Sequence, residues 1–231
     1  MSISKTHLES ELSNLKNSTI EMARLAKKQI VKSVEALFKF DKNLAREVRV
    51  KEKRLNALEL KIDRECENIL ALYNPVATDL RFVFSTLRIN SNIERIGDNA
   101  EGLSKVVLNA KSEFDKDLLK KVGVKEMADT CIEMIDMICE SFQNEDSDVA
   151  RKMFEMDVIL NERNDAVSEI IVDYLQKETS KEEALNALAI LHVVRKLERV
   201  GDCVTNIAEE IIFHLEAEVL KHHNLLKKIT E

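Results

Sequence analysis

Two six-residue segments carry the side chains best suited to chemistry. Residues 93–98 read Ile-Glu-Arg-Ile-Gly-Asp, and residues 197–202 read Leu-Glu-Arg-Val-Gly-Asp. Two carboxylates four residues apart on one helix face repel each other by a few tenths of a kcal/mol, and the glycine between them costs up to ~1 kcal/mol relative to alanine. A bound cation would remove the first penalty. Close approach of a neighbouring helix or a ligand would explain the second.

Polar side chains at i, i+4, i+7 and i+11, the spacing of one helix face, occur in both segments and in two earlier ones. The later helices offer Glu94, Asp98, Glu101 and Lys105, and Glu198, Asp202, Thr205 and Glu209; the earlier ones offer Glu52, Asn56, Glu59 and Asp63, and Asp157, Asn161, Asn164 and Ser168. Oxygen donors from two adjacent helices suit Mg²⁺, Mn²⁺ or Fe. The predicted metal ligands are Glu52, Glu94, Asp98, Glu101, Asp157, Glu198, Asp202 and Glu209.

The alternative is that these acids are ordinary solvent-facing residues. Ile93, Ile96 and Ala100 begin an apolar stripe, and the acidic stripe lies roughly opposite it at 100° per residue. Exposed carboxylates without histidine predict weak metal binding that is lost as the pH falls through ~4. Such sites would stand empty until Fe, Zn, Mn or Mg is supplied.

Other site chemistries find little support. Glu-x-x-His is absent, which argues against a ferritin-like di-iron site, and four scattered glycines build no phosphate-binding loop. No Ser/His/Asp arrangement can be assigned. His214, His222 and His223 are expected to be solvated, and the four cysteines are expected to be buried, reduced thiols.

Composition indicates the elements that must position these residues. Of 231 residues only 4 are glycine and 1 is proline, too few breakers for an all-β fold. Hydrophobic residues make up 45%, aromatic residues 4% and charged residues 33%, which is typical of long helices around an aliphatic core. No run of ~18 apolar residues predicts a membrane span, and the first residues do not resemble a secretory signal. We therefore expect a cytoplasmic protein.

The chain is a tandem duplication. A shift of 105 residues aligns Leu55-Asn56 with Leu160-Asn161, and a shift of 104 aligns residues 93–98 with 197–202. Two of the four glycines fall on equivalent positions, which chance explains poorly. The sequence predicts an all-α fold of two antiparallel three-helix bundles, residues 1–115 and 116–231.

Local signals place the helix ends. In the first unit we expect breaks near Phe40, where Asp41 can cap the next helix, and at Asn74, with Pro75 at the first position of the third helix. The third helix should end near residue 110, and the boundary between the units should fall at 114–123. In the second unit, which starts near Asp117, breaks are expected at 144–148 and 179–180, where Ser180 and Glu183 form a capping-box pattern.

Charge is unevenly distributed. The stretch Arg24–Arg64 holds 13 basic and 6 acidic residues, while the whole chain has a net charge of −7. Such a stretch could face an acidic partner or anionic lipid, or simply be a solvated helix face. It lacks interleaved aromatic residues and any recognisable motif, so binding to nucleic acid is not expected.

The duplicated segments 93–98 and 197–202 resemble the Glu-x-x-x-Asp motifs of the PhoU family. Residues 74–81 (Asn-Pro-Val-Ala-Thr-Asp-Leu-Arg) are similar to that family's stretch before its third helix, and residues 205–209 (Thr-Asn-Ile-Ala-Glu) to the end of its second motif. The resemblance extends over almost the whole chain. The sequence departs from the family pattern at Gly102 and Lys105, where Asn and Glu are frequent, and at Glu52 and Asn56, where an acid pair is common.

The resemblance implies a cytoplasmic regulator of phosphate uptake that represses the phosphate-starvation response when phosphate is plentiful. Its implied partners are the ATPase subunit of the phosphate ABC transporter, a sensor histidine kinase and a second copy of the chain in a homodimer. Iron or zinc on the acidic motifs, at Glu94, Asp98, Glu198 and Asp202, is also implied. The residues favour a non-catalytic adaptor; the alternative is a metal-dependent hydrolase or oxidase that uses the acidic stripes.

Overall fold

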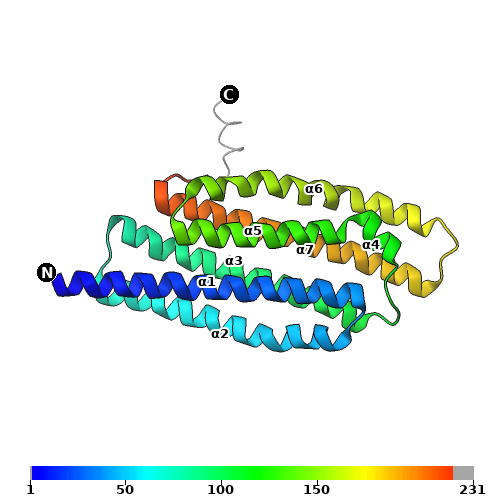
Figure 1. The fold of residues 1–231 in the computed structure, drawn as a ribbon, viewed down its shortest axis with the longest axis horizontal. Coiled ribbons are helices and arrows are strands. Elements are labelled where there is room, and N and C mark those ends of the chain that lie inside the picture. Colours follow the sequence, from blue (N-terminus) through cyan, green and yellow to red (C-terminus); the bar gives the residue numbers. More distant parts are fainter. Residues whose placement is uncertain (1, 221–231) are drawn as a thin grey trace, which may run out of the picture.

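The structure is a computed structural model that describes residues 2–220, with side chains from residue 7 onward, and this part of the chain contains helices and no strand. The long helices run along the long axis of the molecule (Figure 1). The seven helices are α1 (Ser2–Lys39), α2 (Lys42–Tyr73), α3 (Ala77–Asn109), α4 (Lys116–Val122), α5 (Val124–Asn144), α6 (Ser147–Leu175) and α7 (Lys181–Glu216). The predicted all-α duplication is confirmed.

Most helix ends follow the predicted signals. The side chain of Asp41 accepts hydrogen bonds from two backbone N–H groups at the start of α2, and Ser180 with Glu183 completes a capping box at the start of α7. The prediction for Pro75 is wrong. Asn74 ends α2 in the left-handed conformation (φ 47°) and α3 begins only at Ala77, so Pro75 lies in the connection before the helix.

The second unit has four helices where three were expected. Gly123 has φ 77° and its N–H donates to carbonyls at the end of α4, which stops that helix after seven residues. Helix α5 starts directly after this glycine. The short α4 therefore replaces the beginning of the long helix that the repeat predicts.

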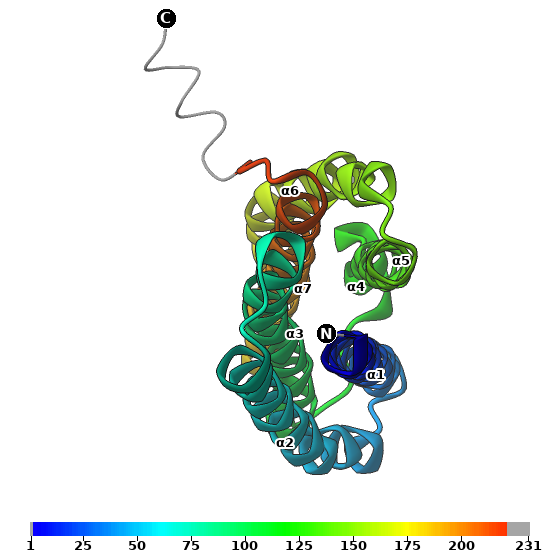
Figure 2. The ribbon, with the colours of Figure 1, turned by 90° about the vertical axis from the view of Figure 1, so that its left-hand side faces the viewer.

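The two units pack side by side. Seen end-on, α2, α3, α7 and α6 form a curved row, and α1 and α5 lie against its inner side (Figure 2). Helices α3 and α7 are neighbours at the centre of this row and run in opposite directions (Figure 1). Arg88 of α3 contacts the buried carboxylate of Glu210 of α7 at 3.2 Å, which fixes the register of the two helices.

The core is aliphatic, as composition predicts. Fully buried side chains come from every long helix, among them Leu15, Ile62, Ile96, Met134 and Leu197. All four cysteines are buried and free, in agreement with the sequence analysis. Burial raises the pKa of each of these thiols, so they are poor nucleophiles.

Many cations of the basic stretch Arg24–Arg64 are neutralised within the fold. Lys27 pairs with Asp136 of α5 at 2.6 Å, and Lys32 pairs with Glu47 at 2.7 Å. Further ion pairs involve Lys39, Arg49, Arg54 and Lys61. Much of the local positive charge is therefore balanced by the protein's own acids. None of the helices within residues 2–220 is both long and apolar enough to span a membrane.

Candidate metal centres

In the first unit, the glycine between the two acids allows α2 to approach α3 closely. A Cβ atom at Gly97 would lie 2.9 Å from Leu55 Cδ1 and 3.1 Å from Glu52 Oε2. Real Cβ atoms almost never come this close to a neighbour. The absence of a side chain at Gly97 thus lets the carboxylate of α2 reach the acidic face of α3, as the close-approach hypothesis expects.

We name Glu52, Glu94 and Asp98 the first acid cluster. Each offers a carboxylate oxygen, and the three atoms lie within 4.8 Å of one another; among the described residues no other such group of three is found. Glu52 is 6% exposed, and its Oε2 accepts no hydrogen bond. Its Oε1 lies 2.8 Å from the amide nitrogen of Asn56, when that amide is turned to donate. Asn56 therefore holds Oε1 of Glu52, and Oε2 is left without a partner and could bind a ligand.

The environment of Glu52 strongly disfavours its negative charge. Burial, followed by the nearby charges of Asp98, Glu101 and Glu94, raises the pKa of Glu52 to about 7. Burial and the charge of Asp98 also raise the pKa of Glu94. A divalent cation between these groups would supply the missing positive charge, and protons compete with it near neutral pH rather than near pH 4.

Glu101, the third predicted ligand on α3, is engaged by cations. Its carboxylate pairs with Lys105 at 2.5 Å and with Arg49 of α2 at 3.3 Å, which together hold its pKa below the usual range despite partial burial. Lys196 of α7 also lies against α3: its Nζ would be 3.2 Å from a Cβ at Gly102. The first acid cluster is therefore bordered by three cations.

The second unit repeats the geometry around its glycine. A Cβ at Gly201 would lie 2.4 Å from Leu160 Cδ1 and 2.8 Å from Asp157 Oδ1. Asn161 donates to Asp157 Oδ2 at 2.8 Å, while Asp157 Oδ1 is buried and accepts no hydrogen bond. Glu52 with Asn56 and Asp157 with Asn161 are thus equivalent pairs, each presenting one unpartnered oxygen to α3 or α7.

We name Asp157, Glu198 and Asp202 the second acid cluster. Burial raises the pKa of Asp157, and the charge of Asp202 raises it further. Burial and the charges of Asp202 and Asp157 raise the pKa of Glu198. Asp157 and Glu198 are thus both affected by the charge of Asp202. Glu209, the remaining predicted ligand, is half-buried about two helical turns beyond Asp202 on α7.

The position of the acidic stripes opposite the apolar stripe suggested that the acids face solvent. The structure shows that they are only partly exposed. Gly97 and Gly201 are buried, and each lies against an acid of the neighbouring helix, Glu52 of α2 or Asp157 of α6. Asp98 and Asp202 remain exposed on the outer rim. Each cluster is therefore half-open, with one buried carboxylate oxygen and other oxygens in reach of solvent.

Both clusters fit a hard or borderline cation. All donors are oxygens, and the duplicated feature is a buried, unpartnered carboxylate oxygen beside the glycine. In the first acid cluster this oxygen also lies within 4.8 Å of two further carboxylates. An unpaired buried charge is costly, and a cation would offset that cost. The donors include no histidine or cysteine, which favours Mg²⁺, Mn²⁺ or Fe over copper.

The expectation of solvated histidines is wrong for His214. His214 was expected to be solvated, but it is 6% exposed and packs edge-on against Phe82, with 5.1 Å between ring centroids. His222 and His223 lie outside the described residues. His214 contributes to neither acid cluster.

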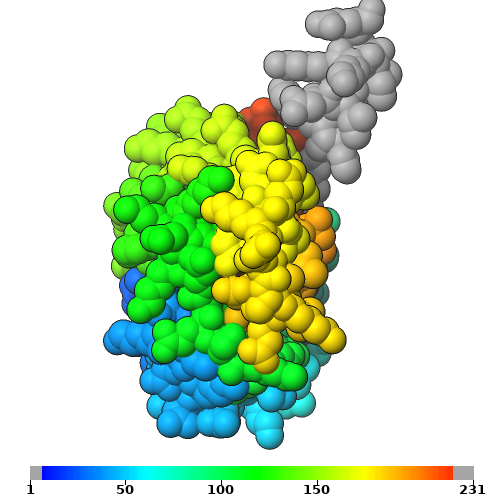
Figure 3. All heavy atoms as spheres, turned by 90° about the vertical axis from the view of Figure 1, so that its right-hand side faces the viewer, coloured from blue at the N-terminus to red at the C-terminus, as the bar shows by residue number. Residues whose placement is uncertain are grey.

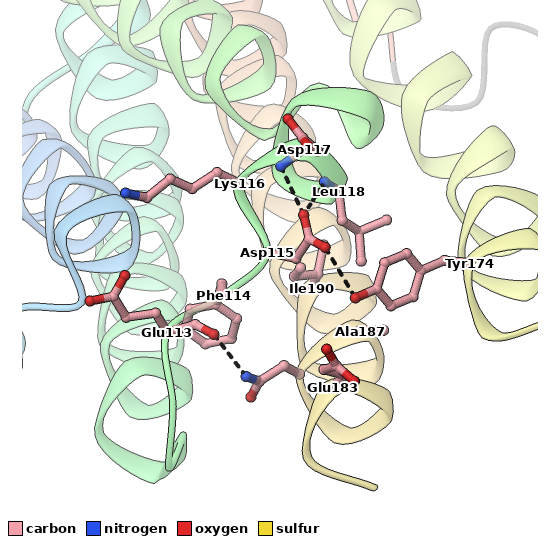
Figure 4. A pocket seen from close by; sticks show the side chains of 11 residues that line it. Glu113, Phe114, Asp115, Lys116, Asp117, Leu118, Tyr174, Glu183, Ala187 and Ile190 are labelled. Carbon is pink, nitrogen blue, oxygen red and sulfur yellow. Dashed lines mark hydrogen bonds between the residues drawn. The ribbon is translucent and has the colours of Figure 1, made fainter. Parts of the chain in front are cut away.

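A separate cavity of about 400 Å³ lies where the connection between the units meets α6 and α7, and sequence reasoning missed it. Tyr174 donates to the carboxylate of Asp115 at 3.1 Å, and Asn186 donates to the carbonyl of Glu113 at 3.2 Å (Figure 4). At this end of the molecule, residues of the connection and α4 border those around the α6–α7 turn (Figure 3). These bonds fasten the connection to the second unit.

Comparison with known proteins accounts for the duplicated pattern. The family model described as "PhoU domain" matches the chain twice, at residues 19–107 and 124–211. Each match includes one acid cluster and its glycine. Residues 108–123, between the matches, include the connection and α4.

Similar proteins cover nearly the whole chain. A phosphate-specific transport system accessory protein PhoU homolog from Burkholderia sp is 28% identical over 94% of this chain and 92% of its own length. A homolog of the same description from Aquifex aeolicus is 31% identical over 94% and 97%. The crystal structure of PhoU from Pseudomonas aeruginosa superimposes with a TM-score of 0.81 at 27% identity, over 91% of this chain and 99% of that one. The chain therefore belongs to the PhoU family.

Proposed function

We propose that the protein is a non-catalytic accessory and regulatory protein of phosphate transport. The observation that carries this proposal is the double family match, with both repeats retaining the acids and the glycine. Relatives that match over more than nine-tenths of this chain are named phosphate-specific transport system accessory proteins. The proposed role is repression of the phosphate-starvation response when phosphate is plentiful.

We further propose that the protein is a cytoplasmic adaptor. It would connect the ATPase subunit of the phosphate ABC transporter with a sensor histidine kinase, acting as a homodimer. Long helices with exposed apolar side chains, such as Leu60, Leu72 and Phe84, offer broad surfaces for protein contacts. No nucleic acid takes part in this proposal.

Capture of partners tests the adaptor role. Tagged protein, mixed with lysate from cells grown in high or low phosphate, should retain the transporter ATPase and the kinase in a phosphate-dependent ratio. Deletion of the protein should activate phosphate-starvation genes in rich phosphate. Normal repression in the deletion strain would refute the regulatory role, and light scattering of the purified protein would test the homodimer.

The two acid clusters are the proposed metal sites. Glu52, Glu94 and Asp98 would hold one cation, and Asp157, Glu198 and Asp202 the other, with Glu101 and Glu209 as further donors. The cation would neutralise each cluster and join α2 to α3, or α6 to α7. Fe, Zn, Mn and Mg are the candidate metals.

Metal analysis tests these sites directly. Glu198→Gln combined with Asp202→Asn should lower the bound stoichiometry after loading with Mn²⁺, while circular dichroism shows an intact fold. Glu94→Gln with Asp98→Asn is the matched variant for the first acid cluster. Equal metal content in wild type and both double variants would leave the acids as solvated surface.

The alternative function is a metal-dependent hydrolase or oxidase. It is favoured only by the juxtaposition of three carboxylates, which could also activate water on a metal. The discriminating measurement is turnover of phosphate esters by Mn²⁺-loaded protein, with Glu94→Gln and Glu198→Gln as controls. Turnover that both substitutions abolish would establish the enzyme and refute the adaptor.

A further inference from the structure

Four cations on the outer side of the contact between α3 and α7 form no ion pair with any described residue. They are Arg95 on α3 and Arg195, Lys196 and Arg199 on α7, and we name them the basic cluster. The three arginines are exposed and Lys196 is half-buried. The ion-paired cations of α1 and α2 behave differently, since Lys27, Lys32 and Arg49 each have an acidic partner.

The register of the helices brings these residues together. Arg88 contacts Glu210, and Gly102 lies against Lys196, so Arg95, midway between 88 and 102, lies opposite position 203 of α7. Arg199 is one turn from that position. At 1.5 Å per residue, Arg95 and Arg199 are offset by about 6 Å along helices whose axes are about 8–10 Å apart. Both side chains are long enough to reach one ligand between them.

The duplication explains why two arginines meet here. Arg95 and Arg199 occupy the same position in the segments 93–98 and 197–202. In the antiparallel register given by Arg88 with Glu210 and Gly102 with Lys196, Gly97 lies level with Gly201, so the equivalent residues two positions earlier stay close to each other. Arg195 and Lys196 break the symmetry, since Ser91 and Asn92 stand at the equivalent positions of the first unit.

His192 of α7 lies close enough to the basic cluster for the positive charges to affect its protonation. Partial burial, followed by the charges of Lys196, Arg199 and Arg195, lowers the pKa of His192. The acids that act on these cations are Glu101 and members of the two acid clusters, which lie on either side of the basic cluster along the row of helices. Cations bound to those acids would leave the basic cluster with an excess of positive charge.

We propose that Arg95 and Arg199, assisted by Arg195 and Lys196, form a binding site for a tetrahedral oxyanion of the phosphate type. The planar guanidinium group presents paired N–H donors that match two oxygens of a phosphoryl group. Two arginines from opposite helices can bind one anion from two sides. This anion site goes beyond the proposed function. It rests on the proposed metal sites in one respect only: metal bound to the acid clusters would strengthen anion binding.

The test is a titration with inorganic phosphate at constant ionic strength. Calorimetry measures affinity, and NMR follows the His192 ring, assigned with a His192→Asn variant. Phosphate should raise the pKa of His192 because it neutralises the neighbouring cations. Arg95→Gln with Arg199→Gln should weaken binding about tenfold or more. Arg46→Gln, an exposed arginine near the start of α2 that contacts Asn43, is the matched control and should bind as wild type does.

Two further arms complete the experiment. The titration is run with chelator and with Mg²⁺, and metal content is measured on the same samples, so that failure of the metal sites is seen separately. Adenosine monophosphate replaces inorganic phosphate in a parallel series, which distinguishes free phosphate from a phosphoryl group on a larger molecule. Binding of either ligand that the double arginine variant loses supports the site. No binding in all series, or binding that the double variant retains, overturns it.

Discussion

The two acid clusters are copies of one design with different surroundings. In both, an acid of the second helix in the unit presents a buried, unpartnered oxygen to a glycine on the third. Around the first, the carboxylates converge within 4.8 Å, and Lys105 and Arg49 bind the adjacent Glu101. Around the second, Asp157 has a shorter side chain than Glu52, and Thr205 stands at the position equivalent to Glu101.

After the duplication, the helix contact at the glycine was kept in both units, while the charges around the acids changed. The close approach at the glycine is retained in both units, and a side chain there would crowd Leu55 or Leu160. The charges around each acid have diverged. We therefore expect similar packing penalties in the two units but different responses to pH and metal.

The largest expected effect is on packing at the glycines. Gly201→Ala should lower the free energy of unfolding by about 1–3 kcal/mol, because its Cβ would overlap Leu160 and Asp157. Gly97→Ala should cost less, since its nearest neighbour would be 2.9 Å away instead of 2.4 Å. Denaturation with urea measures both.

Gly102→Ala is the matched control for the glycine prediction. Its Cβ would meet the flexible end of Lys196, which can move aside. Alanine should then stabilise the helix by about 0.5–1 kcal/mol, its ordinary effect. If Gly201→Ala and Gly97→Ala also stabilise the protein, close approach does not explain either glycine.

The second prediction uses the raised pKa of Glu52. A carboxyl with a native pKa of about 7 binds more protons in the folded than in the unfolded protein between about pH 4.5 and 7. The stability of metal-free protein should therefore fall as pH rises through this window, by about 1–3 kcal/mol, and Glu52→Gln should remove that fall. Urea denaturation at pH 5 and pH 8, with chelator, measures it.

Asp157→Asn is the counterpart in the second unit. The pKa of Asp157 is raised by burial, but the hydrogen bond from Asn161 acts in the opposite direction. Its substitution should change the pH dependence in the same direction and by less. A larger effect at Asp157 than at Glu52 would contradict the comparison of the two units.

Sequence reasoning found the elements of this comparison but not their surroundings. The repeat, the helix ends at Asp41 and Ser180, and the crowded glycines all follow from local patterns, because each depends on residues within one helix or one repeat. Burial of Glu52 does not follow, since a carboxylate on a polar stripe normally faces water. The early stop at Gly123 had a signal, a glycine that follows Lys120 and Lys121 after one intervening residue, that the repeat pattern obscured.

Contacts between the units were out of reach for the same reason. Lys196 lies against Gly102, and Arg88 against Glu210, only because α3 and α7 adopt a particular register. A sequence repeat defines which residues are equivalent and says nothing about how the copies pack. The basic cluster depends wholly on that register.

The third prediction concerns Lys105. Lys105→Gln removes the ion pair that occupies Glu101, so Glu101 can turn toward the first acid cluster. The affinity of that cluster for Mn²⁺ should rise about three- to tenfold, as expected when a competing positive charge leaves. Calorimetry on Lys105→Gln in the background of Glu198→Gln with Asp202→Asn isolates the first site. Unchanged affinity there would show that Lys105 does not restrain the cluster.

The smallest expected effect is at the two asparagines. Asn161→Ala removes the amide that holds Asp157 Oδ2, so the carboxylate gains rotational freedom and its pKa should rise. We expect Mn²⁺ affinity of the second acid cluster to fall about two- to threefold, since a partner that orients a ligand contributes less than the ligand itself. Asn56→Ala should act similarly on the first cluster, where Glu52 has the longer side chain and more conformations to lose. The loss should therefore be greater at Asn56, and calorimetry on the two single variants compares them. Equal or reversed losses would show that the length of the buried acid does not distinguish the two units.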